Sequence, residues 1–264
     1  MTILSAHIAG IGLLGPGCNN WEQGRALLSA DSVGALPPSV SPELACLPAN
    51  ERRRASRIVR LALAVGMEAV AQAVVSPVDL ASVFASSGGD GQNCHTLCET
   101  LADDGSMVSP TRFHNSVVNA PAGYWSIATH ATAASTVLCA SDASFGAGLL
   151  DAMVQVAFSK APCLLIAYDG PYPDPMHRVR PISDIFGVAL LLTPAGHPGS
   201  LATLGLQRSS LAATRCADAA LEAVRTTIPA ARALPLLQCL ARGGGRVVLD
   251  YLAPETLALE VETV

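Results

Sequence analysis

The sequence predicts a mixed α/β fold in which helices are layered on a largely buried sheet. Short apolar segments that suit buried strands alternate along the chain with longer segments whose apolar residues recur at helical spacing. Half of the 264 residues are hydrophobic and only 14% are charged, against about 25% in an ordinary soluble domain. The chain is long enough to bury a large core, and its low charge favours a surface that a partner covers.

Six short apolar segments are interpreted as strands, because each is bounded by glycine or polar turn residues or lies between two helical segments. The first is expected to end at Gly10, where glycines begin to interrupt the apolar residues. The strands are expected at residues 3–10, 83–86, 135–139, 163–167, 186–192 and 246–252.

The helical segments show apolar residues three and four positions apart. The segment 53–75 is rich in alanine on its apolar face, which indicates close packing. We expect Asp142 or Ser141 to cap the start of the helix over 143–158. The helices are expected at residues 21–28, 53–75, 94–102, 119–129, 143–158 and 216–224, with an irregular connection over 31–50.

Composition and local pattern exclude several classes of function. The net charge is −5, and the one basic cluster, at residues 52–60, lies on a single predicted helix, so a nucleic-acid partner is not expected. The apolar runs fall far short of the roughly 18 residues that a membrane-spanning helix needs. No signal peptide is evident, so a cytoplasmic location is expected. The letters of Gly10, Gly12 and Gly15 match a dinucleotide fingerprint, but a loop follows them where that fingerprint requires a helix.

Eight cysteines are scattered over the chain without the spacing of a disulfide framework, which suits reduced and mostly buried thiols. Cys94, His95 and Cys98 lack a second pair of ligands, so neither a metal nor a cofactor is expected. Cys139 has two interpretations. It could act as a nucleophile with a distant histidine as its base, or it could be a core residue of the strand over 135–139.

Four segments, in order, resemble the β-ketoacyl synthases of the thiolase superfamily. They are the opening strand with its Pro16-Gly17 turn, the alanine-rich helix from Arg57 to Ala73, the sequence Phe84-Ala85-Ser86-Ser87-Gly88-Gly89, and residues 109–123, which end in Asn119-Ala120-Pro121-Ala122-Gly123. The resemblance implies a truncated thiolase-like, layered α/β/α fold. Residues 1–195 would form the ketoacyl synthase N-terminal domain, and 196–264 would be a shortened remnant that completes the same fold.

The resemblance also implies a position for the nucleophile. The family's spacing, counted from Asn119, places the nucleophilic cysteine at Asp142, and Gly148 to Ala152 support this register; a slip of three residues would place Cys139 there instead. No counterpart of the family's two catalytic histidines occurs in its context. Without thiolate and histidines, neither decarboxylation nor condensation has its machinery.

These features resemble the chain-length factors of type II polyketide systems, most closely the shortened ones of aryl polyene pathways. The resemblance implies a non-catalytic subunit that forms a heterodimer with an active ketosynthase, meets an acyl carrier protein through that complex, and shapes the acyl tunnel. Residues 135–139 would be the strand that pairs with the partner. The candidate tunnel and interface residues are Arg112, Phe113, His114, Asn115, Val117, Asn119, Tyr124, Trp125, Val137 and Cys139.

Two other functions stay open at this point. The first is a reduced acyltransferase or thioesterase that uses Cys139 with a histidine. The second is a homodimeric module that binds an acyl group or docks a carrier protein.

Overall fold

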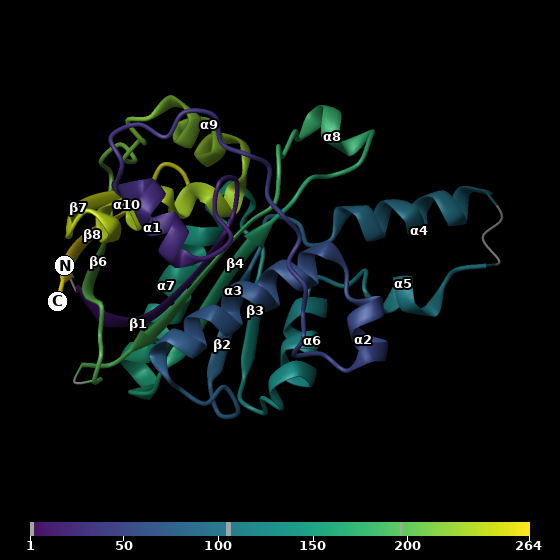
Figure 1. Ribbon diagram of the computed structural model, residues 1–264, viewed down its shortest axis with the longest axis horizontal. Helices are drawn as coiled ribbons and strands as arrows, with labels where there is room; N and C mark the ends of the chain where they lie inside the picture. Colours follow the sequence, from purple (N-terminus) through teal and green to yellow (C-terminus); the bar gives the residue numbers. More distant parts are fainter. Residues whose placement is uncertain (1–2, 104–106, 196) are drawn as a thin grey trace.

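The computed structural model describes residues 3–103, 107–195 and 197–264, and its described part is built on one eight-stranded sheet with helices on both faces (Figure 1). The strand order is β3-β2-β4-β5-β1-β6-β8-β7. β3, β2 and β4 run parallel, and the other neighbours are antiparallel. The strands are β1 Leu4–Leu14, β2 Ala81–Ala85, β3 Ser135–Leu138, β4 Cys163–Asp169, β5 Phe186–Thr193, β6 Ala202–Ser209, β7 Gly245–Asp250 and β8 Thr256–Thr263.

Helices cover the two faces of the sheet unequally. α3 and α6 lie on one face, while α7, α1, α9 and α10 lie on the other together with the short 3₁₀ turn η2. This arrangement confirms the expected layered α/β fold. The helices are α1 Trp21–Ser29, α2 Ala49–Arg54, α3 Arg57–Ala73, α4 Gly91–Asp103, α5 Pro110–His114, α6 Ala120–Thr129, α7 Ser144–Ser159, α8 Met176–Val179, α9 Ala219–Thr227 and α10 Leu234–Ala241, with 3₁₀ turns η1 Ser141–Ala143 and η2 Pro229–Ala233.

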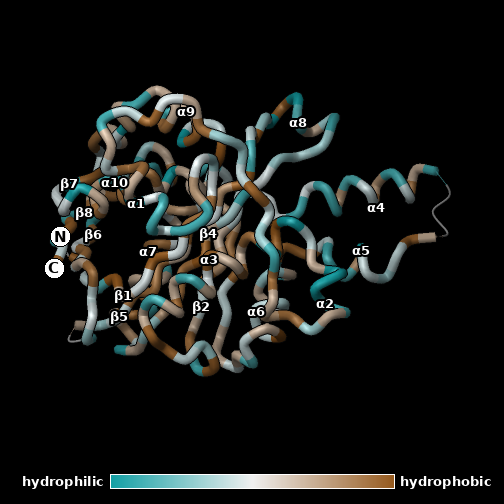
Figure 2. Tube along the Cα trace, viewed as in Figure 1, coloured by the Kyte–Doolittle hydropathy of each residue, from teal (hydrophilic) through white to brown (hydrophobic). Residues whose placement is uncertain are grey.

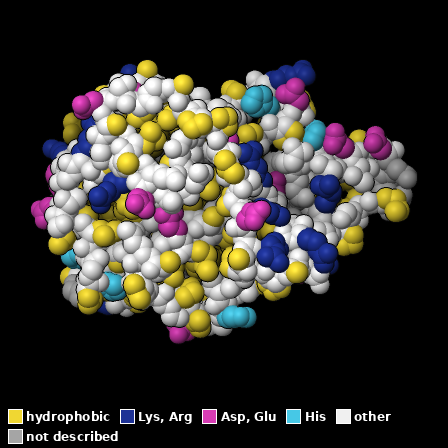
Figure 3. All heavy atoms as spheres, viewed as in Figure 1, with side chains coloured by type: hydrophobic (Ala, Val, Ile, Leu, Met, Phe, Trp, Pro, Cys, Tyr) yellow, Lys and Arg dark blue, Asp and Glu magenta, His cyan; other side chains and the backbone are white. Residues whose placement is uncertain are grey.

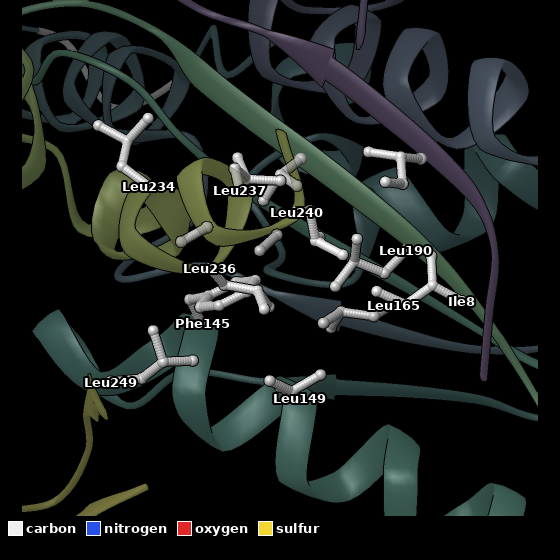
Figure 4. Close-up of a cluster of buried hydrophobic side chains, with 14 of the residues drawn as sticks. Ile8, Phe145, Leu149, Leu165, Leu190, Leu234, Leu236, Leu237, Leu240 and Leu249 are labelled. Carbon is white, nitrogen blue, oxygen red and sulfur yellow. The ribbon is translucent and has the colours of Figure 1, made fainter. Parts of the chain in front are cut away.

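The core divides into two clusters, one on each side of the sheet. On the α7 side, Phe145 and Leu149 pack against Leu165 and Leu190 of the central strands (Figure 4). The opposite cluster is centred on Trp125 of α6, which is fully buried. Apolar residues follow the central strands in Figure 2, as expected for strands that are covered on both faces.

The expected end of the first strand at Gly10 is wrong, because β1 continues to Leu14. α3 lies directly on this stretch: a Cβ at Gly10 would collide with the carbonyl oxygen of Ala69, and one at Gly12 with that of Val65. The glycines therefore permit close approach of a helix to the strand. They lie within a strand rather than in a loop that could hold a pyrophosphate.

Residues 197–264 belong to the same sheet as the rest of the chain. β6 pairs with β1, and β8 and β7 extend the sheet beyond it. The strands β6 and β8 and the helix α10 were not expected from the sequence. Within the described residues, no helix is long and apolar enough to cross a membrane.

α4 and α5 project away from the body of the molecule as an arm (Figure 1). Only Asn93 and Leu97 of α4 are buried, and no residue of α5 is. A helix pair with so little core contact has weak support from its own chain.

Candidate functional site

The turn that joins β3 to α7 holds Cys139 and Asp142, the two positions that the sequence resemblance offers for the nucleophile. β3 lies at the edge of the sheet and pairs only with β2 among the described strands. The backbone N–H of Ala140 donates to Ser144 Oγ at 3.0 Å, and Ser144 Oγ lies 3.1 Å from the carbonyl oxygen of Ser86. Ser141 has a φ of 51°, which is uncommon for a residue with a Cβ. The chain thus leaves the edge strand through a tight turn that is tied to β2.

Neither Asp142 nor Ser141 caps α7 with its side chain, so that prediction is wrong. α7 begins at Ser144 without a side-chain cap, after the 3₁₀ turn η1. The Asp142 carboxylate instead accepts a hydrogen bond from Arg180 at 2.7 Å and lies 3.7 Å from Arg232. Two cations distant in sequence compete with the local N–H groups for this carboxylate, and charge-assisted bonds are the stronger ones.

Cys139 is not a core strand residue, because it follows the last residue of β3 and is exposed. The thiol group is partly buried although the residue as a whole is exposed. This partial burial and the nearby Asp169 carboxylate raise the pKa of Cys139 above its usual range. Among the described residues, no hydrogen bond joins Cys139 to a histidine. A catalytic cysteine needs the opposite environment, one that lowers its pKa and supplies a base.

The expectation of mostly buried thiols is also wrong for the chain as a whole. Three of the eight cysteines are buried and two are exposed, and all eight are free. Among the described residues, no group of three or more histidine, cysteine or acidic side chains is placed to hold a metal ion.

Sequence reasoning missed Asp169, a fully buried carboxylate at the end of β4. Asp169 Oδ1 accepts hydrogen bonds from the backbone N–H of Ser87 at 2.8 Å and from Ser86 Oγ at 3.2 Å. Burial raises the pKa of Asp169 to about 6, against which the serine bonds act. The signal in the sequence is an aspartate before Gly170 at the end of an apolar strand, which alone cannot be distinguished from a turn residue.

The predicted tunnel residues of α5 and the following turn fall into two groups. Phe113, on the arm, is 66% exposed, and Val117, in the turn after it, is 50% exposed. Asn115 is buried and donates to the Arg54 carbonyl oxygen at 3.0 Å, which anchors the end of α5 to α2. The exposed group is available to a partner, whereas Asn115 has a structural role within this chain.

Tyr124 and Trp125 lie in the core rather than on a surface that a tunnel could reach. They are 2% and 0% exposed, and the Trp125 ring packs on Gly66 of α3. Burial also raises the pKa of Tyr124. Both side chains therefore pack in the core of this chain.

The other candidates lie near these two groups. His114 is exposed and meets Tyr124 edge to face, with ring centroids 6.5 Å apart. Asn119 is exposed at the start of α6, where its side chain makes no cap. Val137 is half-buried in the middle of the edge strand β3.

A hollow of about 580 Å³ lies between the arm and the body, and its walls are basic. It is lined by Arg53, Arg54, Arg57 and Arg112, together with Asp90. Figure 3 shows Lys and Arg side chains gathered over α2 and α5 on this face. The expectation that the arginine cluster at 52–60 lies on a single helix is wrong, because it is divided between α2 and α3. Three of its arginines line the concave surface shared with the arm.

Comparison with known families identifies the class of protein. Residues 20–247 match the family described as the N-terminal domain of β-ketoacyl synthase. The match covers most of the chain, so the protein belongs to the β-ketoacyl synthase family. No curated protein matches the sequence.

Solved structures with this fold include complexes of a ketosynthase with a chain length factor. One is the ketosynthase ApeO in complex with its chain length factor ApeC from Xenorhabdus doucetiae, at 24% identity and a TM-score of 0.76 over 97% of this chain and 99% of that chain. The ishigamide ketosynthase/chain length factor matches at 14% identity and a TM-score of 0.74, over 98% and 99% of the two chains.

A third structure contains a carrier protein. The type II polyketide synthase complex AntDE:AntF, an acyl carrier protein with its ketosynthase bound to the hexaketide, matches at 10% identity and a TM-score of 0.75 over the whole of both chains. At these identities the likeness establishes a shared fold.

Proposed function

We propose that this chain is a chain-length factor: a subunit without condensing activity that pairs with an active ketosynthase and shapes its acyl tunnel. The observation that carries the proposal is the turn after β3, where a carboxylate held by two arginines stands at the position that the family's spacing gives to the nucleophile. A carboxylate engaged in this way cannot accept an acyl chain as a thiolate does.

The sheet edge supports a role in assembly. β3 presents one free edge, and an unpaired strand edge is a ready template for a strand of another chain. The arm and the turn that follows it also carry exposed apolar side chains, among them Phe113, Val117 and Val118. Exposed apolar side chains of this kind favour an interface with another protein.

The tunnel role rests on Phe113. An aromatic ring that is two-thirds exposed on an arm with little core support gains contacts when a partner covers it. In the proposed complex its ring lines the acyl tunnel and limits the length of the chain by its volume. The carrier protein would meet this subunit only through the complex.

The test is co-expression with a ketosynthase encoded beside this gene, followed by size-exclusion chromatography with mass detection and an assay of product with and without this chain. We expect a 1:1 complex, product only when both chains are present, and no condensation by this chain alone. Val117→Arg should weaken the complex, whereas Val74→Arg, at an exposed valine outside the arm, should not. The proposal would be refuted if this chain is a monodisperse monomer that binds none of the ketosynthases tested.

A Cys139-dependent acyltransferase or thioesterase is the second candidate, because the thiol is exposed. The raised pKa of Cys139 and the lack of a histidine bond among the described residues weigh against it. A homodimeric acyl-binding module would be recognised by a native mass of two copies without any partner.

A further inference from the structure

A row of alternating charges leads from the turn after β3 into the C-terminal helical layer. The two carboxylate oxygens of Asp142 face different cations, Arg180 at 2.7 Å and Arg232 at 3.7 Å. Arg232 also bonds Asp250 at 3.1 Å, and Asp250 bonds Arg225 at 2.6 Å. The row thus joins η1, the segment before β5, η2, the end of β7 and α9.

The arginines in this row are more buried than Asp142, the anion at its start. The side chain of Arg225 is 6% exposed and that of Arg232 is 17% exposed, whereas Asp142 is 55% exposed. A buried guanidinium without a counter-charge is costly. Arg225 has Glu222 as a second partner at 2.7 Å, but Arg180 has Asp142 alone among the described residues. Asp142, the most exposed anion of the row, is therefore the one that neutralises Arg180 at its end.

The same turn is attached to the sheet edge from its other side. The backbone N–H of Ser86 donates to the carbonyl oxygen of Leu138, the last residue of β3, and Ser144 links Ala140 to Ser86. A Cβ at Gly146 would collide with the Asp250 carbonyl oxygen, so the start of α7 lies directly on the end of β7. The turn is held between the edge strand and the C-terminal layer, with Asp142 at the junction.

We propose that Arg180 and Arg232 form a carboxylate-binding site which the chain fills with its own Asp142, and that this clamp sets the geometry of the partner-facing edge strand. Asp142 is then a positioning residue. The effect on partner binding rests on the proposed function, but the clamp itself does not.

Asp142→Ala removes the internal carboxylate and leaves Arg180 without its partner among the described residues, whereas Arg232 keeps Asp250. We expect the variant to unfold at a lower temperature than the wild type, and acetate to restore part of that loss, since a free carboxylate can enter the emptied site. Chloride at the same ionic strength should not restore it, and acetate should leave the wild type unchanged. A residue that only packed or capped a helix would show no such rescue.

In the complex, the same variant should bind the ketosynthase about fivefold more weakly, the factor that corresponds to the loss of a partly exposed ion pair of about 1 kcal/mol. Amide hydrogen exchange over residues 138–143 should rise. Glu260→Ala is the matched control, because Glu260 forms an exposed ion pair with Arg246 at 3.4 Å on the far side of the sheet. It should alter neither partner binding nor exchange at this turn.

A second substitution keeps the test decisive if Asp142→Ala folds poorly. Arg180→Gln should raise exchange over 138–143, and acetate should not reverse this because half of the binding site is gone. Unchanged exchange in both variants, or no acetate effect on a folded Asp142→Ala, would overturn the clamp. Failure of the wild type to bind any ketosynthase would refute the proposed function, while the acetate and exchange measurements would still decide the clamp.

Discussion

Replacing Cys139 by alanine separates the assembly role from a covalent catalytic role. The thiol is exposed at the end of the edge strand, so its loss costs little stability, within about 0.5 kcal/mol for a surface substitution. Partial burial of the thiol and the nearby Asp169 carboxylate raise its pKa above the usual range. The thiol is therefore mostly protonated at pH 7. A nucleophile in that state would be nearly inactive.

The assay measures product formed by the complex of this chain with its ketosynthase. We expect Cys139→Ala to leave the rate and the product length unchanged, whereas replacing the partner's own nucleophilic cysteine should abolish product. In parallel, iodoacetamide labelling of the free chain at Cys139 should be slow at pH 7 and should accelerate as the pH rises through 9, as expected for a thiol with a raised pKa.

Cys98→Ala serves as the matched control, because Cys98 is the other exposed thiol of the chain and lies on α4, away from the turn. It removes one labelled site without touching the candidate nucleophile. The reasoning fails if Cys139 is alkylated rapidly at pH 7. It also fails if the product disappears in Cys139→Ala while the complex still forms.

Three further predictions concern the tunnel, the strand packing and the buried acid. Phe113→Ala should lengthen or broaden the products of the complex, as measured by mass spectrometry, because the removed ring is two-thirds exposed on the arm. Gly12→Ala should lower the free energy of unfolding by about 1–3 kcal/mol in chemical denaturation, since its Cβ would collide with the Val65 carbonyl oxygen. Asp169→Asn should gain stability relative to the wild type, by roughly 3 kcal/mol, as the pH rises from 4 to 7.

The sign of the last prediction follows from the raised pKa. Burial raises the pKa of Asp169 to about 6 from 3.8, so the folded state holds the proton more tightly than the unfolded state does. Stability is then lost as the pH rises through this range. A pH-independent difference between Asp169→Asn and the wild type would contradict the burial argument. Unchanged products in Phe113→Ala would reassign that ring to interface packing, and an unaffected Gly12→Ala would show that α3 can move away from β1.

Several longer elements of the first two-thirds of the chain follow from local pattern. The helix expected over 143–158 occurs at Ser144–Ser159, and the strand expected over 163–167 continues to Asp169. The single helix expected over 53–75 is wrong, because the chain forms α2 Ala49–Arg54 and α3 Arg57–Ala73 instead. α7 and β4 are long or fully apolar, so their pattern allows few other assignments of secondary structure. In contrast, α10 carries Pro235 in its first turn, where proline is tolerated but reads as a breaker. α10 was missed, as were the strands β6 and β8.

Gly10 and Gly12 show why boundaries fail where the tertiary structure decides. As local signals they end a strand, yet β1 continues through them because α3 approaches its backbone. The sequence holds the information in the small residues of the helix segment 57–73, but only as a statement about packing. The order of strands in the sheet decides which strand those residues approach. A short segment of sequence does not contain that order.

The candidate site also could not be predicted in full from local sequence. The spacing from Asn119 singled out Asp142, but local rules assigned it to helix capping, whereas the structure gives its carboxylate to Arg180 and Arg232. Those arginines come from the segment before β5 and from η2, both distant from the turn in sequence. A carboxylate at this position is a weak nucleophile wherever it lies, but it becomes a structural anion only in that assembled context. The carboxylate in place of a thiol at Asp142 can thus be predicted from residue type, while its ion pairs with Arg180 and Arg232 depend on the fold.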